Sequence, residues 1–97
     1  MTKKKTEEYG LSLGHVIKVE EYRYSSKDKE PSSWNVVLEC LGTGGRKRLA
    51  EFYGRSKVDG VYVGLVDARR YAAFKKLEYG DEASLITEIL KTYMYMD

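Results

Sequence analysis

Hydrophobic and polar residues alternate with the period of a β-strand along much of the first two thirds of the chain. The clearest strand is predicted at residues 34–41, where successive side chains point to opposite sides. One side would carry Trp34, Val36, Leu38 and Cys40, and the other Asn35, Val37, Glu39 and Leu41. Because both sides contain apolar residues, we expect this strand to be covered twice, by a helix or by a second copy of the chain.

The segment before this strand is also strand-like, but the phase of its alternation changes. Ile17 and Val19 alternate in one phase, whereas Tyr22 and Tyr24 alternate in the other. A β-bulge inserts one extra residue and would turn all four side chains to the same side of the sheet. We therefore predict a bulge at residues 20–21.

Polar and glycine-rich segments separate the predicted strands. Residues 25–33 form a polar loop, and the Gly-Thr-Gly-Gly sequence at 42–45 is typical of a tight hairpin that needs positive φ angles. The return strand is predicted at 46–53. A second turn region at 54–60 precedes a fourth, valine-rich strand at 61–66.

Two helices are predicted at the end of the chain. Asp67 would cap the first, over residues 68–79, and Gly80 would end it. Apolar residues are spread around the circumference of this helix. Asp81 would cap the second helix, whose apolar residues recur on one stripe. That stripe consists of Leu85, Ile86, Ile89, Leu90 and Tyr93.

These elements predict an α+β fold, with about four antiparallel strands followed by two helices. The last helix would pack on one face of the sheet, and either the first helix or a second copy of the chain, in a homodimer, would cover the other. Residues 1–10 are expected to be a flexible charged tail, and residues 11–97 a single domain. This order of elements resembles the general plan of dimeric single-strand-binding cofactor domains, a likeness of architecture that implies no site residues.

The composition excludes several classes of function. Among 97 residues there are one cysteine (Cys40) and one histidine (His15), too few for a disulfide or a zinc cluster. Neither residue has the context of a catalytic nucleophile, so we expect no enzyme, no metal and no cofactor. No apolar run suits a membrane span or a secretory signal, which favours a cytoplasmic protein. The chain has no glutamine and only one asparagine (Asn35), a bias found in heat-adapted cells and their viruses.

The net charge of +2 conceals a basic centre and an acidic end. Nine basic residues and only three acidic ones lie between Arg46 and Lys76, whereas residues 81–97 hold one basic and four acidic residues. Tyrosines are interleaved with the basic residues, and arginines with exposed aromatic rings suit the phosphates and bases of a single strand. The predicted nucleic-acid-binding residues are Arg46, Lys47, Arg48, Tyr53, Arg55, Lys57, Tyr62, Arg69, Arg70 and Trp34.

We therefore expect a small non-enzymatic nucleic-acid-binding protein that favours single-stranded DNA or RNA, is homodimeric and has no membrane partner. The alternative is a protein-interaction module, such as a small viral or regulatory inhibitor. Such a module would use the same surface against a protein, because tyrosine and arginine also dominate interface hot spots.

Overall fold

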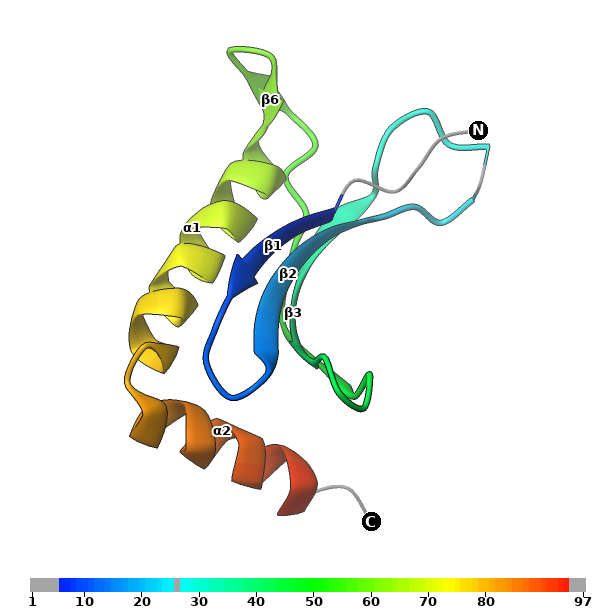
Figure 1. The fold of residues 1–97 in the computed structure, drawn as a ribbon. Helices are drawn as coiled ribbons and strands as arrows, with labels where there is room; N and C mark the ends of the chain where they lie inside the picture. Colours follow the sequence, from blue (N-terminus) through cyan, green and yellow to red (C-terminus); the bar gives the residue numbers. More distant parts are fainter. Residues whose placement is uncertain (1–5, 26, 95–97) are drawn as a thin grey trace.

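Four antiparallel strands in the order β1-β2-β3-β4 form one curved sheet, and helix α1 lies across one of its faces (Figure 1). The computed structural model describes residues 6–25 and 27–94, and their side chains as far as Thr92. The strands of the sheet are β1 (Thr6–Gly10), β2 (His15–Tyr22), β3 (Ser33–Cys40) and β4 (Arg46–Phe52). A short hairpin of β5 (Lys57–Val58) and β6 (Val61–Tyr62) leads into α1 (Val63–Tyr79), and α2 (Glu82–Met94) follows at an angle. The predicted α+β class, with four strands followed by two helices, is confirmed.

The hydrophobic core lies between α1 and the middle of the sheet. Residues that pair across β2 and β3 share a face of the sheet, as Ile17 does with Leu38 and Val19 with Val36. These two pairs lie on the face that α1 covers. Small residues on the inner side of α1 let its backbone approach the sheet closely. The buried cluster consists of Ile17, Val19, Trp34, Val36, Leu38, Ala68, Ala72, Tyr79 and Leu85.

Two segments differ from the prediction, although the number of strands in the sheet does not. Thr6–Gly10 pairs with β2 as strand β1, so this part of the predicted tail belongs to the sheet. Residues 1–5 lie outside the described residues. The predicted fourth strand at 61–66 is wrong: only Val61–Tyr62 is extended, and α1 begins at Val63. Leu65, Ala68 and Ala72 recur at helical spacing on the buried face, and this burial outweighs the β-propensity of the valines.

The start of α1 also explains why Asp67 is not its N-cap. Tyr62 stands at the N-cap position and makes no side-chain capping bond. The first N–H groups of the helix instead donate to the preceding loop, Val63 N–H to the Ser56 carbonyl at 2.9 Å and Gly64 N–H to the Gly54 carbonyl at 2.9 Å. Backbone carbonyls thus satisfy donors that a side chain would normally cap. The cap predicted at Asp81 is confirmed, because its carboxylate accepts from Ala83 N–H at 3.3 Å.

The bulge predicted at residues 20–21 is wrong. β2 pairs with β3 in unbroken register from His15 to Tyr22. The irregularity lies instead between β3 and β4, where Val36 faces Ala50 while Val37 faces Arg48, and Leu49 is the extra residue. Since β2 keeps its alternation, Tyr22 points away from the core that holds Ile17 and Val19.

The face of the sheet opposite α1, which we call the open face, has no helix over it in the described structure (Figure 1). Val16 and Val37 point to this face, yet they are only 3% and 4% exposed. Long charged side chains lie around them; for example, Lys18 Nζ is 2.9 Å from Glu39 Oε2. The aliphatic parts of such chains can cover apolar surface while their charges stay in water. Within one chain, these charged side chains therefore cover Val16 and Val37, whereas Leu41 at the end of the same side is 60% exposed.

Helix α2 buries only half of its predicted apolar stripe. Leu85 is fully buried and Ile89 packs against the core, whereas Ile86 and Leu90 are 45% and 55% exposed. The side chain of Tyr93, the last member of the stripe, lies outside the described residues. The wide apolar side of α2 thus has a core-facing half and an exposed half.

Candidate nucleic-acid interface

The ten predicted binding residues do not form one surface. Strand alternation sends Arg46 and Arg48 to the open face and Lys47 to the helix side, although the three are consecutive. Tyr53 follows β4 and reaches the open face through its hydroxyl. A second group gathers beside the β5–β6 hairpin, and it consists of Trp34, Lys57, Tyr62 and Arg69. The remaining two are separate, because Arg55 pairs with Glu30 at 3.8 Å and Arg70 is exposed on α1.

The cations of the open face are each held by a carboxylate. Arg46 pairs with Glu20 and lies 3.4 Å from Glu39, and Arg48 lies 3.5 Å from Glu51. The hydrogen bond to Glu20 raises the pKa of Arg46. These ion pairs are exposed enough to be screened by water and salt, so a phosphate can compete with the carboxylates for the guanidinium groups.

Three tyrosines gather at one end of the open face. Tyr22, Tyr24 and Tyr53 are 39%, 74% and 59% exposed, and the rings of Tyr22 and Tyr24 meet edge to face with centroids 5.3 Å apart. The Tyr53 hydroxyl donates to Glu51 Oε1 at 2.6 Å, and the Ser33 hydroxyl donates to Glu51 Oε2 at 2.8 Å. These bonds lower the pKa of Glu51, while the bond to Glu51 raises the pKa of Tyr53. A shared carboxylate thus orients an exposed aromatic ring.

The predicted site omits two members of this cluster, Tyr22 and Tyr24. It also includes Trp34, which cannot stack on a base. Tyr22 and Tyr24 were assigned to the core side by the predicted bulge, although their opposite phase to Ile17 and Val19 was the signal of an outward position. Trp34 is fully buried beneath α1, so no base can stack on its ring. Its indole N–H has no acceptor within the described structure.

The group beside the β5–β6 hairpin lines a cavity of about 360 Å³, whose wall is partly polar and partly apolar. Arg69 binds Glu7 of β1 through two nitrogens, with Nε 3.0 Å from Oε1 and Nη2 2.5 Å from Oε2. Lys57 Nζ lies over the ring of Tyr62, 4.7 Å from its centroid. The bidentate pair ties α1 to the edge strand, so Arg69 has a structural role that leaves little of its charge for a phosphate.

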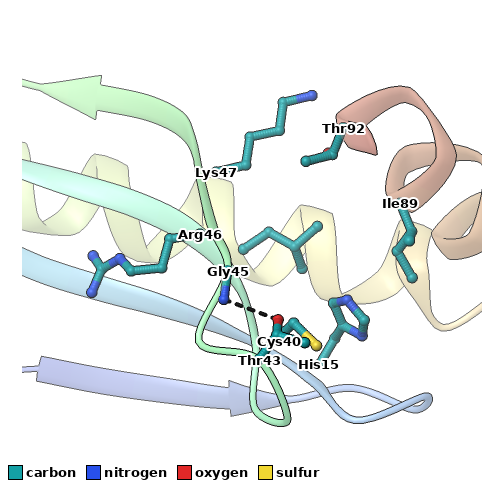
Figure 2. A pocket seen from close by; sticks show the side chains of 9 residues that line it. His15, Cys40, Thr43, Gly45, Arg46, Lys47, Ile89 and Thr92 are labelled. Carbon is teal, nitrogen blue, oxygen red and sulfur yellow. Dashed lines mark hydrogen bonds between the residues drawn. The ribbon is translucent and has the colours of Figure 1, made fainter. Parts of the chain in front are cut away.

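A cleft of about 250 Å³ separates α2 from one end of the sheet (Figure 2). Ile89 points into it from α2, while His15 and Cys40 enter from neighbouring strands. Lys47 spans its edge, with Nζ 3.0 Å from Glu88 Oε1 of α2. Cys40 is half-buried instead of forming part of the core, and hydrogen bonds with Thr43 lower the pKa of its thiol. The cleft wall is largely apolar, and its lysine links α2 to β4.

The described residues contain no group of three or more His, Cys, Asp or Glu side chains arranged to hold a metal ion. In the same part of the chain, neither helix is long and apolar enough to cross a membrane. Comparison with protein-family models, with curated proteins and with solved structures finds no match for this chain.

Proposed function

We propose that the protein is a non-enzymatic binder of single-stranded nucleic acid and that the open face of the sheet is its binding surface. The observation that carries this proposal is the cluster of three exposed tyrosines beside Arg48, on a face that neither helix of the described structure covers. Exposed aromatic rings on a sheet give bases a flat apolar surface, and stacking works with any base.

The balance of charge on the open face favours binding of a single strand, with moderate affinity, over binding of a duplex. Arg46, Arg48 and Lys18 can meet phosphates, but Glu20, Glu39 and Glu51 lie among them. A duplex presents two phosphate rows and is bound chiefly through charge, which this balanced face supplies poorly. A single strand exposes its bases as well, and each stacked base contributes about 1–3 kcal/mol. Stacking is therefore the main source of affinity, with the arginines positioning the backbone.

The first test measures how binding depends on salt. A fluorescent oligonucleotide of roughly 10–20 nucleotides, long enough to fill the roughly 4–16 nucleotides that one small β-domain covers, is titrated at two or more salt concentrations. Replacing Arg46 and Arg48 together by glutamine should reduce the slope of log K against log salt by about 1.4, from ~0.7 for each contact with a single strand. The matched control is Lys47→Gln, because this residue lies between them in sequence but points to α2.

The second test concerns stacking. Tyr24→Ala should weaken binding by about 1–3 kcal/mol, the contribution of one base, while Tyr24→Phe should retain most of the affinity. Val58→Ala is the control, since this side chain is 63% exposed on the β5–β6 hairpin, which is not part of the four-stranded sheet. An equal loss from Lys47→Gln and from the double arginine variant, or no loss from Tyr24→Ala, would contradict the proposal.

A protein-interaction module is the second candidate. It is favoured by the ion pairing of five predicted phosphate-binding residues, Arg46, Lys47, Arg48, Arg55 and Arg69, which reduces the electrostatic attraction to polyanions. Under this alternative the tyrosine cluster would contact a protein, because tyrosine supplies large contact area with little loss of conformational entropy. Failure to bind any oligonucleotide at low salt would make this candidate the leading one.

A further inference from the structure

Helix α1 is apolar on its outer side as well as on the side that faces the sheet. Phe74 and Leu77 are 72% and 78% exposed, and Ala73 beside them is exposed too. Six of the 17 residues of α1 are charged, but these three apolar side chains lie together on the side away from the sheet, and an exposed apolar cluster can mark an interaction surface. In the described structure the sheet lies on one side of α1, and the outer side of α1 faces away from it (Figure 1).

Helix α2 has an exposed apolar stripe of the same length. Ile86 and Leu90, one turn apart, are 45% and 55% exposed, while the core-facing half of the helix is covered. The four exposed side chains of the two helices offer roughly 400 Å² of apolar surface, which is about half of what one partner buries in a standard interface. The polar residues around them can supply the remainder.

The two exposed stripes carry opposite charges at matching positions. Arg70 lies one turn before Phe74 on α1, and Glu82 lies one turn before Ile86 on α2. Both charged residues are exposed, and neither forms an ion pair within the described part of the chain. The order Arg70, Phe74, Leu77 therefore matches the order Glu82, Ile86, Leu90, with charge opposite charge and apolar residue opposite apolar residue.

We propose that the outer stripe of α1 (Arg70, Phe74, Leu77) packs on the exposed stripe of α2 (Glu82, Ile86, Leu90) in a second copy of this chain. A two-fold axis makes the contact occur twice, since each copy offers both stripes and residue i meets j while j meets i. The charge difference between the stripes favours this arrangement over a parallel contact of α1 with α1, which would bring arginine to arginine. This interface does not depend on the proposed function, because it lies away from the open face.

The oligomeric state of the full chain tests the proposal. Light scattering or sedimentation at tens of micromolar should give a mass of twice 11.2 kDa. Phe74→Glu and Ile86→Glu should each raise the dissociation constant by roughly tenfold or more, because a charge replaces an apolar residue at the centre of the contact. Leu41→Glu is the matched control: Leu41 is 60% exposed in the turn directly after β3, and this variant should remain dimeric. Far-UV circular dichroism checks that every variant is folded.

Charge reversal distinguishes the pairing of α1 with α2 from other dimers. Arg70→Glu and Glu82→Arg should each weaken the dimer, and the double variant should regain most of the loss, because the pair is restored with its signs exchanged. A monomeric wild-type protein would overturn the proposal. It would also be overturned if Phe74→Glu left the dissociation constant of the dimer unchanged. The same holds if the double variant lost as much dimer stability as the two single variants lose together. Binding of monomeric protein to anionic lipid vesicles, lost in Phe74→Glu, would assign the outer stripe to a membrane surface instead.

Discussion

Replacing Gly64 by alanine tests the closest contact between α1 and the sheet. An ideal Cβ at this position would lie 2.5 Å from Cε3 and 2.6 Å from Cζ3 of Trp34, and 2.8 Å from the backbone nitrogen of Gly54. Non-bonded carbon atoms normally stay about 3.5–4.0 Å apart. Trp34 is fully buried in the core cluster, so its ring can move only by giving up its packing contacts there. The added methyl group must therefore push α1 away from β3 or force the indole from its position.

The expected destabilisation follows from two opposing effects. Overpacking of a well-filled core costs about 1–3 kcal/mol. Alanine gains up to about 1 kcal/mol over glycine in a helix interior, and less in the first turn, where Gly64 lies. Gly64→Ala should thus lower the free energy of unfolding by about 1–2 kcal/mol. For a domain of this size each kcal/mol lowers Tm by roughly 4–8 °C.

Urea unfolding followed by far-UV circular dichroism measures this difference. Trp34 is the only tryptophan, so its fluorescence cannot follow variants that lack it. A double-mutant cycle with Trp34→Phe assigns the cost, because the smaller ring leaves room for the methyl group and should remove most of the penalty of Gly64→Ala. Gly10→Ala is the control, since no atom lies within 4 Å of a Cβ built there.

Two results would refute this reasoning. If Gly64→Ala were as stable as the wild type, α1 and the indole ring of Trp34 would not be in such close contact. If its cost were unchanged in the Trp34→Phe background, the penalty would come from the Gly54 backbone and not from the tryptophan ring.

Three further predictions concern the ion pairs and the buried tyrosine. The hydrogen bond to Arg69 lowers the pKa of Glu7, so the ionised pair stabilises the fold above about pH 4.5 and is lost as the pH falls through the lowered pKa. Glu7→Gln should therefore cost about 0.2–1 kcal/mol near neutral pH and almost nothing in strong acid, as measured by urea unfolding. Burial raises the pKa of Tyr79, so the unfolded chain ionises first and stability falls above about pH 10. Tyr79→Phe should reduce this alkaline loss in the same assay, and an unchanged pH profile would count against it. Lys47→Met removes the 3.0 Å ion pair with Glu88, and hydrogen exchange should show α2 losing about 0.2–1 kcal/mol of protection while β2 stays unchanged.

The local signals in the sequence were reliable where neighbouring residues decide the structure. Strand 34–41, the Gly-rich hairpin after it and the Asp81 cap of α2 all follow from side-chain alternation, glycine conformations and a carboxylate near free N–H groups. The start of α1 was misjudged because three valines favour a strand in isolation. Their actual conformation depends on Gly54 and Ser56, which satisfy the first helical N–H groups from a loop outside the helix.

The candidate site was harder to predict than the fold, because a surface combines residues from several strands. Tyr22, Tyr24 and Tyr53 come from two segments about thirty residues apart, and only strand pairing brings them together. The same pairing sets carboxylates beside the arginines of the basic segment, so charge that is separated along the chain is largely neutralised in space.

The α+β class, the alternation of β3, the hairpin and the cap of α2 could all be predicted, since each depends on residues close together in the chain. Contacts between distant segments set the rest: the entry of Thr6–Gly10 into the sheet, the direction of Tyr22, the burial of Trp34 and the carboxylate partners of Arg46, Arg48 and Arg69. The physical reason is that strand order, register and the placement of a bulge depend on pairing and burial between distant segments, and a single register change exchanges the two faces of a strand.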